Sequence, residues 1–324
     1  MKDLSILIPS RNEEFVNETV IDALKNIEAD TEIIVVFDGA PPERPLPKDK
    51  RIHTVFLNDS IGQRAATNLA CRMARGKYVM KLDAHCSFDK GFDRKMLEGF
   101  EKVGDEVAMI PVMRNLWAFD WKCMTCGKKW YQGPTPTRCK ETNYKGTGKP
   151  CDGTVFTKKI VWQGKPSPQS VSYCFDSEPH FQYFNEYKSR DKYRNDLKTG
   201  FTETMSLQGS CFMLTKDNYW KWDVCDEKAG SWGNQGLEVA CAIWLSGGRC
   251  LVNHNTWYAH MFRTQGGDFG FPYEQKGNTV EKTKKYIKDK FWKMEHPTQI
   301  HSIKWLLEKF WPVKGWSDKD VEKL

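Results

Sequence analysis

The stretch that decides the fold is Lys77-Tyr78-Val79-Met80-Lys81-Leu82-Asp83-Ala84-His85-Cys86, an apolar β-strand that ends in an acid–x–histidine pair. Side chains alternate along a strand, so Asp83 and His85, two residues apart, point the same way. In an open α/β sheet, ligands bind at the carboxyl ends of the strands, where this pair stands. A carboxylate beside an imidazole supplies half of a divalent-metal site, and a metal there can hold a diphosphate. An ordinary strand-end turn with an incidental histidine is the alternative interpretation.

The residues before this stretch alternate short buried strands with amphipathic helices. Strands are predicted at residues 4–8, 32–37 and 52–56, and helices are predicted at residues 16–27 and 62–75. This βαβ alternation, with continuous apolar strands, predicts a mostly parallel, Rossmann-like sheet covered by helices. No G-x-G-x-x-G follows the first strand, so the sequence gives no support for a dinucleotide cofactor.

The residues after this stretch divide into three parts. A strand at 107–112 leads into an insert, residues 117–165, and residues 163–206 are polar with few predicted elements. Order returns with strands at 210–214 and 249–253 around a helix at 236–246, and two helices are predicted in the tail, at 279–294 and 300–311. We therefore predict the domains as 1–116, the insert 117–165, 166–270, and a helical tail, 271–324.

Composition bounds the class of protein. Thirteen Trp and 18 Phe in 324 residues indicate a packed globular chain. No apolar run approaches the roughly 20 residues that span a membrane. The N-terminus enters a core strand directly, so we expect no secretory signal and a cytoplasmic protein with reduced thiols. Eleven cysteines, an odd number, then favour metal binding over a disulfide framework.

Four of the cysteines lie in the insert. Cys123 and Cys126, followed by Gly127, have the spacing of a zinc knuckle, and Cys139 and Cys151 complete a set of four. Four thiolates suit tetrahedral zinc and leave no open position, so we expect a structural ion in a zinc-ribbon-like module. The second pair is separated by eleven residues instead of two, as if a loop were inserted. Four free cysteines in a loop is the alternative.

The insert also carries the net positive charge of the chain. Residues 122–165 contain ten basic and two acidic residues, a net +8, whereas the whole chain is +7. A solvated face is the ordinary interpretation of a charge run. A localised surplus within a compact module suits a polyanionic partner better.

Further motifs follow the chain in a fixed order. They are Ile6-Leu7-Ile8-Pro9-Ser10-Arg11-Asn12-Glu13-Glu14, Phe37-Asp38-Gly39, Gly62-Gln63-Arg64-Ala65-Ala66-Thr67-Asn68, Trp232-Gly233-Asn234-Gln235-Gly236-Leu237-Glu238 and Ala259-His260-Met261-Phe262-Arg263. Together with Asp83-Ala84-His85-Cys86, they resemble GT-A-fold glycosyltransferases. The resemblance is closest to the polypeptide N-acetylgalactosaminyltransferases and their family-2 relatives, and it covers residues 4–115 and 207–265.

The resemblance implies a UDP-sugar donor and a role for each motif. Asp83, His85 and His260 would hold Mn²⁺ or Mg²⁺ against the diphosphate, and their roles would be catalytic. Residues 1–116 would bind the nucleotide sugar, and 166–270 would form the acceptor side. Donor contacts would come from Pro9, Arg11, Glu13, Asp38, Arg64, Trp232 and Arg263. The glycine-rich loop 264–270 could act as a lid.

The acceptor segment departs from the family pattern. The family has an acid and an Asn where this chain has Gln235 and Gly236. An inverting enzyme needs a carboxylate base near the acceptor hydroxyl. The missing acid favours a retaining reaction, with Gln235 in the catalytic region. Glu238 acting as the base is the competing hypothesis.

Three acceptor hypotheses follow. The first is DNA, because Trp130, Tyr131 and Tyr144 lie among the lysines of the insert. The compact architecture resembles phage glycosyltransferases that modify 5-hydroxymethylcytosine, which favours a hydroxymethylated base and, for a phage-encoded chain, the host cytoplasm. The second is a protein Ser/Thr or a glycan. The third is a non-catalytic nucleic-acid-binding module, against which the complete Asp83, His85 and His260 set argues.

Overall fold

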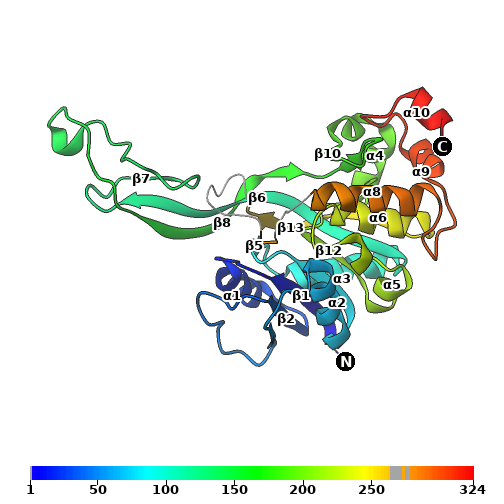
Figure 1. Ribbon diagram of the computed structural model, residues 1–324, viewed down its shortest axis with the longest axis horizontal. Helices are drawn as coiled ribbons and strands as arrows, with labels where there is room; N and C mark the ends of the chain where they lie inside the picture. The colour runs from blue at the N-terminus through cyan, green and yellow to red at the C-terminus, as the bar shows by residue number, and fades with distance from the viewer. Residues whose placement is uncertain (1, 263–271, 274–277) are drawn as a thin grey trace.

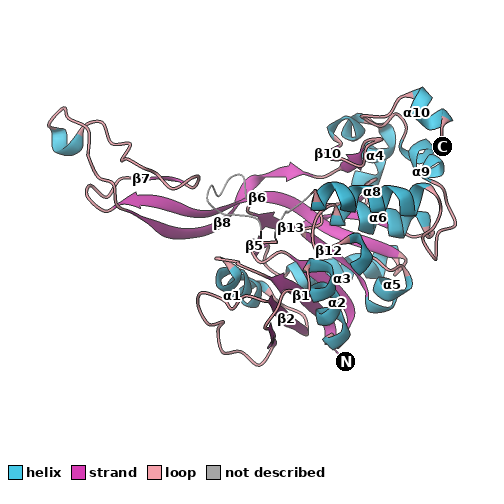
Figure 2. Cartoon of the chain, viewed as in Figure 1, coloured by secondary structure: helices cyan, strands magenta, loops and turns pink. Residues whose placement is uncertain are grey.

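The computed structural model describes residues 2–262, 272–273 and 278–324 (Figure 1). Within these residues, one mixed sheet of eleven strands runs through the body, with the order β11-β13-β6-β12-β4-β1-β2-β3 along its main path. Figure 2 shows the helices gathered around this sheet and one long pair of strands extending away from it.

The N-terminal part is the predicted βαβ region. It contains β1 (Lys2–Ser10), α1 (Val16–Asn26), β2 (Thr31–Asp38), β3 (Ile52–Leu57), α2 (Gln63–Met73), β4 (Gly76–Leu82), β5 (Cys86–Phe88) and α3 (Phe92–Val103). Strand β1 lies between β2 and β4, and all three are parallel. Strand β2 is buried along its whole length, as its unbroken apolar run predicts, and α2 lies against β1 and β2.

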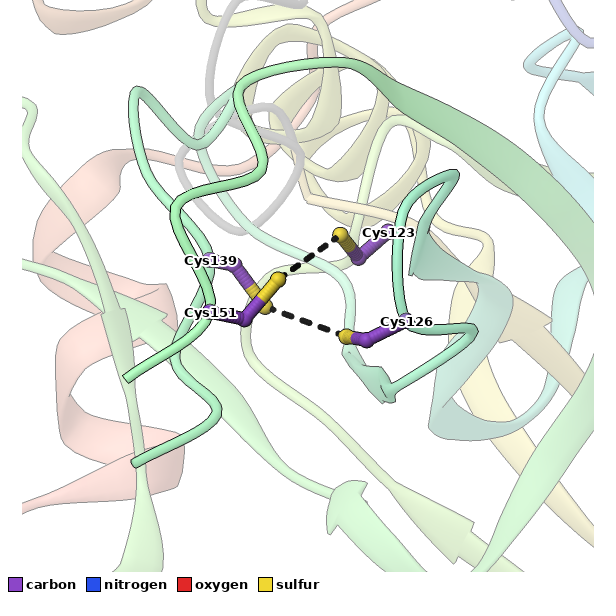
Figure 3. A group of neighbouring side chains, drawn as sticks. All are labelled: Cys123, Cys126, Cys139 and Cys151. Atoms are coloured by element: carbon purple, nitrogen blue, oxygen red, sulfur yellow. Dashed lines mark hydrogen bonds between the residues drawn. The ribbon is translucent and has the colours of Figure 1, made fainter. Parts of the chain in front are cut away.

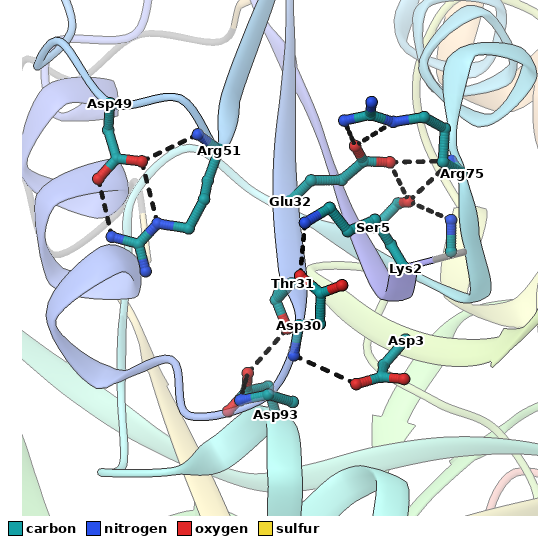
Figure 4. Close-up of polar contacts among 12 residues, drawn as sticks. Lys2, Asp3, Ser5, Asp30, Thr31, Glu32, Asp49, Arg51, Arg75 and Asp93 are labelled. Atoms are coloured by element: carbon teal, nitrogen blue, oxygen red, sulfur yellow. Dashed lines mark hydrogen bonds and ion pairs between the residues drawn. The ribbon is translucent and has the colours of Figure 1, made fainter.

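Buried polar contacts fix the loops of this region (Figure 4). The Asp93 carboxylate accepts the backbone N–H of Glu28 and Ala29, both at 2.9 Å, and the Thr31 hydroxyl at 2.8 Å. Glu32 accepts the Ser5 hydroxyl at 2.7 Å and the Arg75 guanidinium. These contacts satisfy buried hydrogen-bonding groups at the end of β1 and β2 that lies opposite the predicted ligand site. They therefore stabilise the fold and take no part in the site.

The second part of the sheet corrects the prediction of a mostly parallel arrangement. It contains β6 (Val107–Cys123), β7 (Lys129–Tyr131), β8 (Phe156–Ser170), β9 (Tyr173–Phe175), β10 (Phe181–Tyr183), α4 (Asp191–Leu197), β11 (Phe201–Glu203), β12 (Cys211–Thr215), α5 (Lys216–Lys221), α6 (Gln235–Leu245) and β13 (Arg249–His260). Strand β12 is antiparallel to both β4 and β6, and β11 is antiparallel to β13. A buried strand reads as an apolar run in either direction, so the sequence pattern does not reveal this reversal.

The insert continues the central sheet. Strand β6 does not end at residue 112 but runs on to Cys123, and β8 pairs with it antiparallel. We call this pair, with β7 and the loops between Cys123 and Phe156, the arm; it projects from the body in Figures 1 and 2. One face of the arm packs on the body, because Phe119 stacks on Phe15 with ring centroids 5.9 Å apart.

The C-terminal tail is helical, as predicted. It contains α8 (Thr279–Trp292), α9 (Ile303–Phe310) and α10 (Asp318–Glu322). Helices α8 and α9 contact α6, which in turn lies against β6 and β13. Phe291, Leu306, Leu307 and Phe310 are fully buried, so the tail is part of the core. Among the described residues, no helix combines the length and the apolar character that crossing a bilayer requires.

Candidate active site

Three predicted metal ligands, distant in sequence, meet at one end of the sheet. Asp83 follows β4, His85 precedes β5, and His260 is the last residue of β13. Strand β13 pairs antiparallel with β5, so that His260 lies opposite Cys86 and next to His85. His260 Nε2 is 3.1 Å from His85 Nε2 and 3.3 Å from Asp83 Oδ2. We call these residues the triad.

The geometry of the triad fits a divalent cation. Ligand atoms about 2.1 Å from one ion and at right angles to each other lie about 3.0 Å apart. The third distance, from His85 Nε2 to Asp83 Oδ2, is 3.9 Å, and all three ligand atoms lie within 4.8 Å of one another. One carboxylate and two imidazoles are a donor set that Mn²⁺ and similar ions accept.

The protonation states of the triad also suit a cation. Burial lowers the pKa of His260 to about 4, so its imidazole is neutral at physiological pH and has a free lone pair. Burial raises the pKa of Asp83, but the nearby Lys81 ammonium and the two imidazoles outweigh this effect and bring it well below the usual value. Asp83 is therefore ionised.

Two buried charged residues hold the triad in position. Glu13 Oε2 lies 3.0 Å from His85 Nδ1, which leaves Nε2 of that ring directed at the other ligands. Lys81 has a fully buried side chain, forms an ion pair with Asp83 and donates a hydrogen bond to the Gly209 carbonyl at 2.7 Å. Sequence reasoning missed Lys81, although a lysine inside a buried apolar strand, two residues before Asp83, is an available signal.

A cavity of about 430 Å³ opens beside the triad. Its lining includes the predicted donor contacts Pro9, Arg11, Glu13 and Trp232. Its volume lies within the range typical of small-molecule sites. Predicted residue Arg263 and the glycine-rich loop 264–270 lie outside the described residues.

Asp38, another predicted donor contact, is not among the residues that line this cavity. Its carboxylate accepts hydrogen bonds from the Ser60 hydroxyl at 2.9 Å and from the backbone N–H of Ile61 and Gly62 at 2.6 and 3.0 Å. Asp38 is fully buried. It shapes the turn that begins α2, because a carboxylate with these three donors has its lone pairs directed into the protein.

Arg64 and Glu238 are likewise removed from the cavity. Arg64 Nε donates to Glu238 Oε2 at 2.7 Å, and the guanidinium also donates to the carbonyls of Gly230 and Gly233. Both side chains are 1% exposed, and the second Glu238 oxygen accepts the Asp226 N–H at 2.8 Å. Glu238 therefore does not line the described cavity, where a catalytic base would have to reach the acceptor hydroxyl.

Gln235 lines the cavity. Its Nε2 donates to Cys225 Sγ at 3.2 Å. Its Oε1 is buried and has no hydrogen-bond partner among the described residues. Because a buried carbonyl without a partner is costly, this oxygen is suited to accept a hydroxyl of a bound ligand.

The four cysteines of the arm form a second cluster (Figure 3). Cys123 Sγ is 4.0 Å from Cys151 Sγ, and Cys126 Sγ is 3.5 Å from Cys139 Sγ. Sulfurs about 2.3 Å from a tetrahedral zinc ion lie about 3.8 Å apart, so these distances fit zinc. Backbone N–H groups support the sulfurs: Glu141 donates to Cys139, and Gly153 donates to Cys151, both at 3.4 Å.

Comparison with known proteins agrees with this architecture. Residues 5–164, just under half of the chain, match the model of the glycosyl transferase family 2. The crystal structure of GalNAc-T7 with UDP, GalNAc and Mn²⁺ superposes with a TM-score of 0.64 at 15% identity, over 95% of this chain and 56% of that chain. The GT-A-like α/β fold expected from the sequence is confirmed.

Curated relatives match parts of the chain. A probable N-acetylgalactosaminyltransferase 6 of Caenorhabditis elegans is 20% identical over 73% of this chain and 31% of its own length. The putative teichuronic acid biosynthesis glycosyltransferase TuaG of Bacillus subtilis is 31% identical over 29% of this chain and 40% of its own. The chain thus spans less than half of these relatives. The match of residues 5–164 to a glycosyl transferase family supports the predicted enzyme class, a glycosyltransferase.

The buried pair of Arg64 and Glu238 generates a stability prediction. Arg64→Met leaves the Glu238 carboxylate buried without a counter-charge, so we expect the free energy of unfolding to fall by about 3–5 kcal/mol. The double variant Arg64→Met/Glu238→Leu removes both charges and should recover part of this loss. Urea titration followed by tryptophan fluorescence measures both. A double variant no more stable than Arg64→Met would contradict the structural role given to the pair.

The cysteine cluster generates a prediction about metal content. We expect the purified protein to carry about one zinc ion per chain, measured by plasma mass spectrometry, because four thiolates at these distances complete its coordination. Cys139→Ser should lose most of this zinc. Cys71→Ala, which changes a buried cysteine of α2, is the matched control and should retain it. Equal zinc content in the two variants would refute the site.

Proposed function

We propose that the chain is a metal-dependent glycosyltransferase that moves a sugar from a UDP-sugar to a hydroxyl group of an acceptor. The observation that carries this proposal is the convergence of Asp83, His85 and His260 beside the cavity. The family match supports the reaction class, and the similarity to a structure that holds UDP, GalNAc and Mn²⁺ supports the donor and the metal.

The residues of the site have distinct tasks in this proposal. Asp83, His85 and His260 would hold Mn²⁺ or Mg²⁺, which, when bound, stabilises the negative charge of the departing diphosphate. Glu13 fixes the orientation of His85. Lys81 fixes Asp83 and keeps an additional positive charge next to the site. Both contacts lower the reorganisation needed when the donor binds, because the ligand side chains already have their working geometry.

The lining of the cavity favours retention of the anomeric configuration. Among the described lining residues, the carboxylates are Glu13 and Asp83, and both are engaged with the triad or its supports. Gln235, on the acceptor side, cannot take a proton as a base does. An inverting displacement needs a carboxylate base for the acceptor hydroxyl, and the described lining residues offer none that is free of the triad and its supports.

For the acceptor, we propose the 5-hydroxymethyl group of a modified cytosine in DNA. The concentration of basic residues in the arm supports a polyanionic acceptor. A protein Ser/Thr or a glycan is the second candidate, supported by the names of the N-acetylgalactosaminyltransferase relatives. A non-catalytic nucleic-acid-binding module would have no use for the three metal-ligating side chains of the triad.

His260→Ala tests the metal and the reaction class together. It removes one ligand, so we expect Mn²⁺-dependent UDP release from a panel of UDP-sugars to fall by at least about 100-fold. His180→Ala, an exposed histidine outside the cavity lining, is the control and should keep wild-type activity. Mn²⁺ binding, followed by the paramagnetic resonance of free Mn²⁺, gives a second measurement. Unchanged Mn²⁺ affinity in His260→Ala would refute the triad as the metal site.

The acceptor is identified by incubating the protein with Mn²⁺, the UDP-sugars, and hydroxymethylated or unmodified DNA. We expect a hexose or N-acetylhexosamine adduct on 5-hydroxymethyl-2′-deoxycytidine, detected by mass analysis of the digested nucleosides, and none on unmodified DNA. Serine- and threonine-containing peptides form a parallel reaction. Transfer to these peptides and not to DNA would overturn the proposed acceptor while leaving the reaction class intact.

A further inference from the structure

A single strand links the candidate active site to the cysteine cluster. Asn115 of β6 lies opposite His260 of β13, and the same strand ends at Cys123. The eight residue-to-residue steps from Asn115 to Cys123 span about 26 Å at about 3.3 Å per step. The arm therefore extends from the level of the triad outwards, without a flexible linker between the two (Figure 1).

The arm carries four lysines on one side, which we call the lysine face: Lys122, Lys129, Lys159 and Lys165. Lys122 and Lys129 are directly opposite each other on β6 and β7, and Lys159 on β8 lies opposite Asp120 of β6. Cross-strand partners share a face of the sheet, so the first three side chains project together. The ammonium of Lys165 lies 4.2 Å from the centroid of the Tyr131 ring. Tyr131 is a cross-strand partner of Asp120, so Lys165 lies on the same side.

These charges are not neutralised within the described protein. None of the four lysines forms an ion pair with a described residue, in contrast to Lys128 and Lys158 of the same arm, which pair with Glu141 and Glu14. The approach of Lys159 lowers the pKa of Lys129, a sign of mutual repulsion. The acid on this face, Asp120, accepts a hydrogen bond from Trp117 Nε1 at 2.9 Å. The lysine face thus holds a net positive charge that a ligand can neutralise.

Aromatic rings lie among these lysines. Trp117 and Tyr131 meet edge to face with centroids 5.8 Å apart, and the Tyr131 residue is 37% exposed. Where the arm joins the body, its opposite face is covered, because Phe119 and Trp162 pack there on Phe15. The exposed side is consequently the one with both the lysines and the aromatic pair.

We propose that the lysine face binds the phosphate backbone of a nucleic acid and guides that strand toward the triad. This inference rests on the proposed function, because it assigns a partner to the same catalytic site. A row of cations along a straight, rigid arm matches a polymer with regularly spaced negative charges. Exposed aromatic rings between the cations can stack on bases.

An acidic protein segment is the competing partner, and the aromatic pair decides against it. Carboxylates pair with lysine ammonium groups but offer no flat rings to stack on Trp117 and Tyr131, whereas every nucleotide supplies both a phosphate and a ring. The length of the arm adds a specific expectation. Along a strand with about 3.4 Å between successive nucleotides, 26 Å corresponds to about eight nucleotides between the reacting base and the far end of the lysine face.

The test compares two charge-matched variants. Lys122→Gln/Lys129→Gln/Lys159→Gln removes three charges of the lysine face, and Lys48→Gln/Lys50→Gln/Lys319→Gln removes three exposed lysines elsewhere. Affinity for a fluorescent duplex of about 20 base pairs, and for one of its single strands, is measured against salt concentration. For the lysine-face variant we expect at least about tenfold weaker binding and a decrease of about 2–3 in the log–log salt slope. The control variant should resemble the wild type.

Two further measurements separate this inference from the proposed function. UDP-dependent Mn²⁺ binding should be the same in the wild type and the lysine-face variant, because the lysine face does not line the cavity. If the wild type lacks Mn²⁺ and UDP binding but the salt-dependent DNA binding is as expected, the proposed function fails and the lysine face stands. With poly-glutamate as the acidic-protein probe, competition equal to that of DNA would overturn the assignment to nucleic acid.

Length dependence gives the final criterion. With single strands that extend the target base by two or by about ten nucleotides on both sides, we expect the longer strand to bind more tightly to the wild type but not to the lysine-face variant. The proposal would be refuted if the wild type bound the short and the long single strands equally well. It would also be refuted if the lysine-face variant and the control variant had equal affinity for DNA.

Discussion

The antiparallel pairing of β5 with β13 is the constraint on which the candidate active site depends. It joins β5, the three-residue strand after β4, to the end of β13, which lies next to the edge strand β11. The pairing places His260 opposite Cys86. Without this pairing, Asp83 and His85 form half of a site. With it, the third ligand atom lies within hydrogen-bonding distance of the other two. The backbone ladder thus positions a metal site that side chains alone do not assemble.

Buried charges around this site are paired with one another. Glu13 contacts His85, Lys81 contacts Asp83, and Arg64 contacts Glu238. Each pair holds a side chain or a loop in a single arrangement, because separating two buried charges costs several kcal/mol. The Arg64 guanidinium also donates hydrogen bonds to the carbonyls of Gly230 and Gly233, which fixes the segment that presents Trp232 and Gln235 to the cavity. The rigidity of the site is therefore electrostatic as well as apolar.

The arm connects the cysteine cluster structurally to the triad. Four cysteines at its outer end close a loop region that has few buried apolar residues of its own, and such regions commonly need a metal to fold. Strand β6 belongs to both the arm and the central sheet, so the position of the cysteine cluster is fixed relative to the sheet. In our proposal, the lysine face uses this rigid strand to hold a nucleic acid at a fixed distance from the triad.

The sequence by itself determined the βαβ half, the triad residues and the four-cysteine set, because each depends on local spacing or on a recognisable motif. It did not reveal that β12 is antiparallel, that β6 continues to Cys123, or that Asp38, Arg64 and Glu238 are turned away from the cavity. Strand direction, strand length beyond an apolar run, and the partner of a buried charge arise from contacts between residues far apart in the chain. Arg64 and Glu238, 174 residues apart, are the clearest case: each has the chemistry of a site residue, and only their meeting in the fold makes them a structural pair.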